Sequence, residues 1–74
     1  MNHNYAAYIE RDLESGMYIG IVPGITGAHT CAESIDELQT RLKEVISLCL
    51  ESMDEEEIKT LPVFAGISQI EVAL

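Results

Sequence analysis

The side chains best suited to catalysis or metal binding in this chain are two carboxylates near its start. Glu10 and Asp12 stand at alternate positions of a strand-like segment, so in a strand both would project from one face. Two carboxylates on one face could bind a divalent cation that activates water. Asp12, however, falls at the end of the segment, where aspartate more simply stabilises a turn. We therefore expect no catalytic site and no metal site, and we interpret the chain as a non-enzyme.

Histidine and cysteine could also supply a base, a nucleophile or metal ligands. No Ser/His/Asp or Cys/His arrangement around His29 has the spacing of a catalytic group, and the histidines lack cysteines at zinc-ligand spacing. His29 is thus either ordinary strand surface or a partner contact. Cys31 and Cys49 form no Cys-x-x-Cys pattern, which predicts buried, reduced thiols in a cytoplasmic protein rather than a disulfide.

The loop Pro23-Gly24-Ile25-Thr26-Gly27 contains two glycines. It lacks the lysine and the glycine spacing of a phosphate-binding loop. A Pro-Gly pair favours a turn, because proline presets one φ angle and glycine can adopt the positive φ of the next position. No pattern in the chain therefore implies a cofactor.

The elements that position these side chains are three short strands and one long helix. Strand-forming residues are separated by turn-forming residues, which predicts an antiparallel meander. The helix begins after Ser34, which together with Glu37 makes a capping-box pattern, and it ends near Ser52. The expected strands cover residues 4–12, 17–22 and 28–32, and the turns cover residues 13–16 and 23–27.

Apolar residues recur at spacings of three and four along the helix, which predicts a stripe that packs on the sheet. They are Ile35, Leu38, Leu42, Val45, Ile46, Cys49 and Met53. The strands themselves do not alternate cleanly between apolar and polar residues, which is typical of a sheet covered on both faces. One helix covers one face, so we expect a second molecule on the other.

An acidic segment and a further strand follow the helix. Ser52 or Asp54 is expected to cap a short helical turn that ends before Pro62. Residues 67–74 alternate in polarity and predict a fourth strand. A right-handed crossover would place this strand parallel to the first, in the order 3-2-1-4. The predicted fold class is α+β with the element order β-β-β-α-β.

Size and charge limit the classes of function. A chain of 74 residues makes one domain, 1–74, whose core is marginal without a partner or self-association. Thirteen acidic against four basic residues give a net charge of −9, which excludes direct binding of nucleic acid. No apolar run approaches the ~20 residues of a membrane span, so we expect no membrane contact. An acidic surface suits a basic protein partner, although it also simply favours solubility.

Short motifs occur in a particular order and spacing over nearly the whole chain. They are Tyr8-Ile9-Glu10, Ser15-Gly16-Met17-Tyr18, Val22-Pro23-Gly24-Ile25-Thr26-Gly27 with Thr30, Ser34-Ile35-Asp36-Glu37-Leu38, and Leu61-Pro62. In these motifs the chain resembles the HicB family of type II toxin–antitoxin antitoxins, specifically its small N-terminal domain. It departs from the family at Ala28, where members usually carry cysteine, and at Leu38, where alanine is common.

The resemblance implies a partial ribonuclease-H-like fold, assembly into dimers or higher oligomers, and neutralisation of a small basic HicA toxin that cleaves messenger RNA. Nucleases with the full fold gather several strand carboxylates around two metal ions. Here the order 3-2-1-4 would bring Glu71 beside Glu10 and Asp12, and no further carboxylate is obviously placed. Many HicB proteins continue into a DNA-binding domain, but this chain stops at the fourth strand, so we do not extend operator binding to it.

The residues expected to bind a partner offer either large contact area or negative charge. Tyrosine combines a broad apolar ring with a polar tip, and the acidic segment after the helix suits a basic toxin. The candidates are Tyr5, Tyr8, Tyr18, His29, Asp54, Glu55, Glu56 and Glu57. The main alternative function is a stand-alone oligomeric HicB-like binding or regulatory domain that has no toxin partner.

Overall fold

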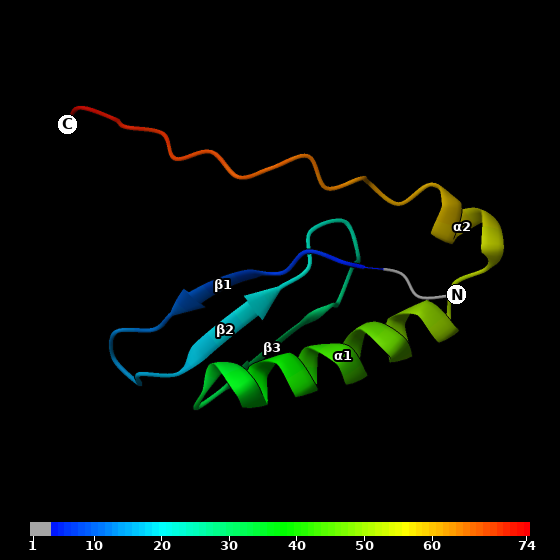
Figure 1. Cartoon of the computed structure of the whole chain (residues 1–74), viewed down its shortest axis with the longest axis horizontal. Helices are drawn as coiled ribbons and strands as arrows, with labels where there is room; N and C mark the ends of the chain where they lie inside the picture. Colours follow the sequence, from blue (N-terminus) through cyan, green and yellow to red (C-terminus); the bar gives the residue numbers. More distant parts are fainter. Residues whose placement is uncertain (1–3) are drawn as a thin grey trace.

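The computed structural model describes residues 4–74. Over this range, three antiparallel strands precede a long helix that lies on one face of the sheet (Figure 1). The small α+β class, the meander and the long helix are therefore confirmed. The elements are β1 (Tyr8–Arg11), β2 (Tyr18–Ile21), β3 (His29–Ala32), α1 (Ile35–Glu51) and α2 (Glu55–Lys59), and the sheet order is β1-β2-β3.

Helix α1 begins and ends where the sequence predicts. The Ser34 hydroxyl accepts a hydrogen bond from the Glu37 backbone N–H at 3.1 Å, and Ser52 caps the other end. The Glu37 carboxylate does not complete a capping box. It pairs instead with the Arg41 guanidinium at 2.6 Å, one turn along the helix, where an acid followed by a base is stabilising.

Helix α2 carries a full capping box. The Asp54 carboxylate accepts from the Glu57 N–H at 2.8 Å, and the Asp54 N–H donates to the Glu57 carboxylate at 3.4 Å. Of the two caps considered from the sequence, Asp54 is thus the one used. The acidic first turn is also favourable because the N-terminal end of a helix carries partial positive charge.

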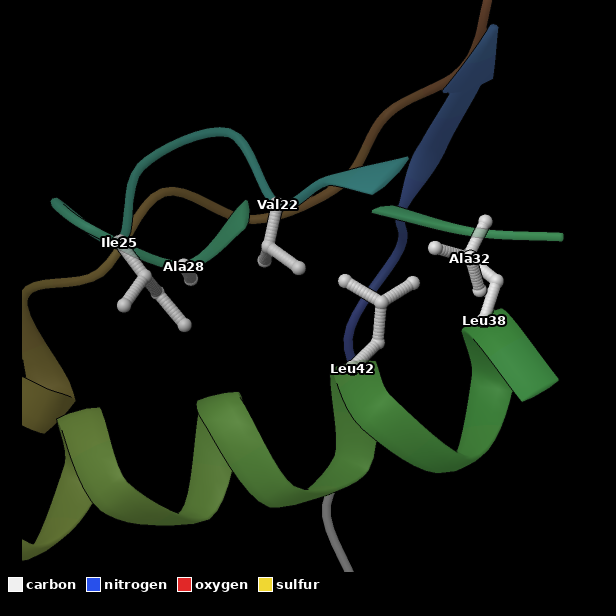
Figure 2. Packing of buried hydrophobic residues seen from close by; sticks show 6 residues of the cluster. All are labelled: Val22, Ile25, Ala28, Ala32, Leu38 and Leu42. Carbon is white, nitrogen blue, oxygen red and sulfur yellow. The ribbon is translucent and has the colours of Figure 1, made fainter. Parts of the chain in front are cut away.

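The core lies between α1 and the sheet, and it extends under the turn that joins β2 to β3 (Figure 2). Leu38 and Leu42 are buried and Val45, Ile46 and Cys49 pack beside them, as the apolar stripe predicts. Ile35, at the start of the predicted stripe, is exposed instead. Helix α1 packs mainly on β3 and, less extensively, on β2. Within residues 4–74 the buried apolar set is Val22, Ile25, Ala28, Ala32, Leu38 and Leu42.

Gly20 lies where Leu42 of α1 packs directly against the sheet. A Cβ atom at this position would lie 2.7 Å from Cδ1 of Leu42, a distance at which one of the two groups must move. The sheet register places Ile9 and Thr30 opposite Gly20, so these residues share its face of the sheet. Tyr8, Ile21 and His29 lie opposite one another in the next row, on the face turned away from the helix.

We expect Gly20→Ala to destabilise the fold by about 1–3 kcal/mol, because the added methyl group overpacks the core against Leu42. Thermal unfolding followed by circular dichroism measures the loss. The double variant Gly20→Ala/Leu42→Val removes one methylene from the crowded site and should recover part of it. An unchanged melting temperature for Gly20→Ala would contradict this packing.

The expected fourth strand is not formed in the described structure. Residues 62–74, here called the C-terminal segment, have no assigned secondary structure, and they run in the same direction as β1 (Figure 1). A strand is stable when its backbone groups bond to a neighbour, and here the segment makes no ladder with β1. Pro62 packs on Gly24, where a Cβ atom would lie 2.8 Å from the proline ring. This contact places the start of the segment beside the β2–β3 turn.

Candidate partner-binding surface

The sheet face turned away from α1 carries a mixed patch of apolar and polar side chains. We call it the open face, and it consists of Tyr8, Glu10, Ile19, Ile21, His29 and Cys31. Tyr8, Ile21 and His29 are all exposed and lie in one row across the three strands. Nothing in residues 4–74 covers this face with a helix, as the sequence predicts. The structure thus brings together two of the expected partner-binding residues, Tyr8 and His29.

The other two candidate tyrosines lie elsewhere. Tyr5 and Tyr18 are half-buried and pack against the core. The Arg11 guanidinium lies 5.9 Å from the centre of the Tyr18 ring, a distance that allows a cation–π interaction. Both rings therefore have a structural use, and Tyr5, Tyr8, Tyr18 and His29 do not make one patch.

The two cysteines are free in the described structure, in agreement with the expected thiols. The expectation that both are buried is wrong for Cys31, which is exposed. The reason is the strand register, because Cys31 lies opposite Ile19 on the open face while its neighbour Ala32 faces α1. Cys49 is half-buried, and its Sγ donates a weak hydrogen bond to the Thr26 carbonyl at 3.8 Å.

The acidic segment lies at the end of the molecule opposite the β1–β2 hairpin (Figure 1). Asp54 and Glu57 are exposed but are held by the capping box of α2, whereas Glu55 and Glu56 project from the same turn without a cap role. Nine of the thirteen acidic residues fall between positions 33 and 57, and so lie on α1, on α2 or just before the first residue of one of them. The negative charge is therefore concentrated on the helices.

The carboxylate pair considered for metal binding does not assemble. The Asp12 carboxylate is turned into the hairpin, where the Ser15 hydroxyl donates to it at 2.7 Å and the Ser15 N–H at 3.3 Å. The segment that carries Glu71 is not paired with β1. Among residues 4–74, no three histidine, cysteine or acidic side chains come together as a metal site would require. Asp12 is thus a turn residue, as the simpler interpretation of the sequence holds.

These hydrogen bonds should make the stability of the fold depend on pH. The Ser15 hydroxyl and then the Ser15 N–H stabilise the carboxylate and lower the pKa of Asp12 below its ordinary value. A lowered pKa adds stability above the unfolded-state pKa, and the gain is lost as pH falls through the folded-state pKa, below about pH 4. We expect Asp12→Asn to remove this acid-dependent part of the stability. Melting temperatures measured across this range test it, with Glu14→Gln in the same turn as the control.

A cleft of about 470 Å³ separates the start of the C-terminal segment from the residues that lead into β1. Its walls are mostly apolar and include Tyr5, Val22 and Phe64; the full lining is residues 4–8, 22–23 and 62–67. The sequence gives no sign of this cleft. It arises because the C-terminal segment runs near β1 without pairing with it, which local patterns do not determine.

Three proteins similar to this chain cover most of its length. A UPF0150 protein of Thermotoga maritima is 40% identical over 68 residues, or 92% of this chain and 88% of the relative. One from Synechocystis is 45% identical over 64 residues, covering 86% and 87% of the two chains. One from Archaeoglobus fulgidus is 43% identical over 68 residues, covering 92% and 93%.

Other comparisons return nothing. No protein-family profile matches the chain, and no solved structure matches it. In the part of the chain that the structure describes, neither helix has the length and apolar character needed to cross a bilayer.

Proposed function

This chain belongs to the UPF0150 family, and we propose that it is an antitoxin-like protein that binds and neutralises a small basic HicA-type toxin. The observation that carries the proposal is the concentration of negative charge along α1 and α2, on a chain of net charge −9. A toxin that cleaves messenger RNA must attract a phosphate backbone with lysine and arginine side chains. A dense acidic surface is complementary to such a protein.

The mode of action is occlusion. Glu55 and Glu56 are exposed on α2 and have no cap role, so they can pair with basic groups without loss of the helix end. The open face supplies the apolar part of an interface through Tyr8 and Ile21, with His29 beside them. An interface of this kind combines an apolar centre with a charged rim. Binding would cover the RNA-contacting surface of the toxin in the cytoplasm, and it requires no catalysis by this chain.

The proposal includes self-assembly and completion of the fold. Residues 67–74 would form the fourth strand of a partial ribonuclease-H-like fold, next to β1 and parallel to it, in the order 3-2-1-4. The polarity alternation of these residues and the shared direction of the C-terminal segment and β1 support this pairing (Figure 1). A dimer or higher oligomer would then cover the remaining apolar surface.

A second candidate function is a stand-alone oligomeric binding or regulatory domain without a toxin. The observation that favours it is the apolar surface of the C-terminal segment, which has no acidic character apart from Glu71. Such a surface suits self-assembly and does not require a basic partner.

Co-expression with the small basic protein encoded beside this chain tests the proposal. We expect a complex that survives purification and restores the growth of cells that express the basic protein. A basic protein of similar size and charge but unrelated sequence is the control for nonspecific attraction. If this chain neither binds its neighbour nor restores growth, and stays an oligomer alone, the antitoxin proposal is wrong and the stand-alone domain is favoured.

A further inference from the structure

The chain exposes much more surface than a compact protein of its mass. Its accessible surface is 6361 Å², whereas a compact chain of 8.2 kDa exposes about 4,500 Å². The radius of gyration is 14.1 Å, against about 11 Å for a compact domain of this length. The surplus of about 1,800 Å² is more than the ~800 Å² that each partner buries in an ordinary stable interface.

Much of this surplus belongs to the C-terminal segment. Ile67, Ile70 and Val72 are 73%, 77% and 68% exposed, and Val63 and Phe64 before them are exposed as well. Apolar side chains left in water at this density mark a surface that another molecule covers. From position 70 the residues alternate in polarity, the pattern of a strand with one buried side.

The sheet offers one edge for such a strand. β1 lies at the edge of the sheet, and each of its four residues is exposed. The cleft beside its N-terminal approach is mostly apolar, and the start of the chain's own C-terminal segment forms its other wall. At the opposite edge, the Cys31 carbonyl of β3 already accepts a hydrogen bond from Arg41 at 2.7 Å, and α1 packs over that strand. An incoming strand would therefore pair with β1.

Charge indicates what kind of molecule supplies the strand. Within residues 62–74, Glu71 is the single ionisable side chain, and in β1 the charges of Glu10 and Arg11 cancel. A basic partner gains little from surfaces this neutral, whereas two copies of an acidic chain can meet at them with little repulsion. In the structure the chain's own segment is not paired with β1, and its start lies against the β2–β3 turn, where Pro62 contacts Gly24.

We propose that two copies of this chain exchange their C-terminal segments, so that residues 67–74 of each copy form the fourth strand beside β1 of the other. This inference rests on the fourth strand proposed above, but it does not depend on a toxin. The exchange would cover the exposed apolar side chains of the C-terminal segment and leave the acidic helices of both copies free.

Cross-linking between two marked copies tests the exchange. In a full-length background with Cys31→Ser and Cys49→Ser, one copy carries Glu10→Cys and a second copy, with a purification tag, carries Glu71→Cys. The copies are unfolded and refolded together, then treated with a short bismaleimide. We expect a covalent dimer that contains both copies. A pair in which Glu14→Cys replaces Glu10→Cys is the matched control and should stay uncoupled, because residue 14 lies in the hairpin turn beyond β1.

A single chain that carries both Glu10→Cys and Glu71→Cys separates the alternatives. If cross-linking closes it into a monomer, the strand pairs within one chain and the exchange is wrong.

Sedimentation provides a second measurement. Ile70→Asp/Val72→Asp should halve the mass of the assembly, while Gln69→Asp/Ala73→Asp, on the other side of the segment, should not. A monomeric parent chain, or a mass unaffected by the first pair, would also overturn the proposal. Neither readout includes a toxin, so the failure of the toxin proposal leaves this test unchanged.

Discussion

Replacement of Leu38 with alanine should cost about 2–5 kcal/mol, the range for removal of a fully buried leucine side chain. Leu38 is 0% exposed, and it is the largest fully buried side chain among the described residues. It projects from the first turns of α1 toward Ala32 of β3 (Figure 2), so the cavity would open where the helix joins the sheet. A chain of 74 residues has a total stability of about 4–11 kcal/mol, so the loss would be a large share of it.

The measurement is thermal or urea unfolding at a fixed protein concentration, since self-association would otherwise shift the transition. A decrease of about 10–25 °C in melting temperature is expected for a domain of this size. Leu48→Ala is the matched control, because Leu48 lies on the same helix but is 66% exposed. It should change the stability by less than about 0.5 kcal/mol. Equal losses for the two variants would mean that α1 does not pack through Leu38.

Local signals in the sequence predict the elements that depend on neighbouring residues. Ser34 fixes the start of α1 and Ser52 its end, and the spacing of Leu38 and Leu42 identifies the buried side of the helix. Each of these features is decided within a few positions, by a cap or by the helical period. The turn at Pro23 and Gly24 likewise follows from backbone preference, and Gly24 has a φ of 89°.

Features that depend on distant residues escape this reasoning. The alternation from Ile70 onward predicts a fourth strand that the described structure does not form, because the pattern does not determine which edge, or which molecule, pairs with it. The exposure of Cys31 depends on the register with β2, since a shift of one residue would exchange it with Ala32. The strand register also explains why Tyr8 is exposed while Tyr18 packs against the core, because the two residues lie on opposite faces of the sheet. One local prediction also fails, because Glu37 pairs with Arg41, four residues along the helix, and does not complete the capping box.

Reversal of two charges on α2 should weaken toxin binding about thirtyfold if the proposed function is right. Glu55→Lys/Glu56→Lys removes two attractions and creates two repulsions against a basic surface. Each lost attraction and each new repulsion is worth about 0.5 kcal/mol for exposed pairs, so the four together are worth about 2 kcal/mol. Asp54 and Glu57 stay in place, so the capping box of α2 is preserved. Titration of the purified toxin at two salt concentrations measures both the loss of affinity and its electrostatic origin.

The matched control is Glu14→Lys/Glu33→Lys, which changes the net charge by the same amount. Both residues are exposed, and the hairpin and the β3–α1 junction that carry them lie at the end of the molecule opposite α2 (Figure 1). Long-range attraction responds to net charge and is screened by salt within about 10 Å at 0.1 M, so a contact at α2 requires the first variant to lose much more affinity than the second. Equal losses would mean that the acidic chain attracts its partner through overall charge, and that α2 is not a specific contact.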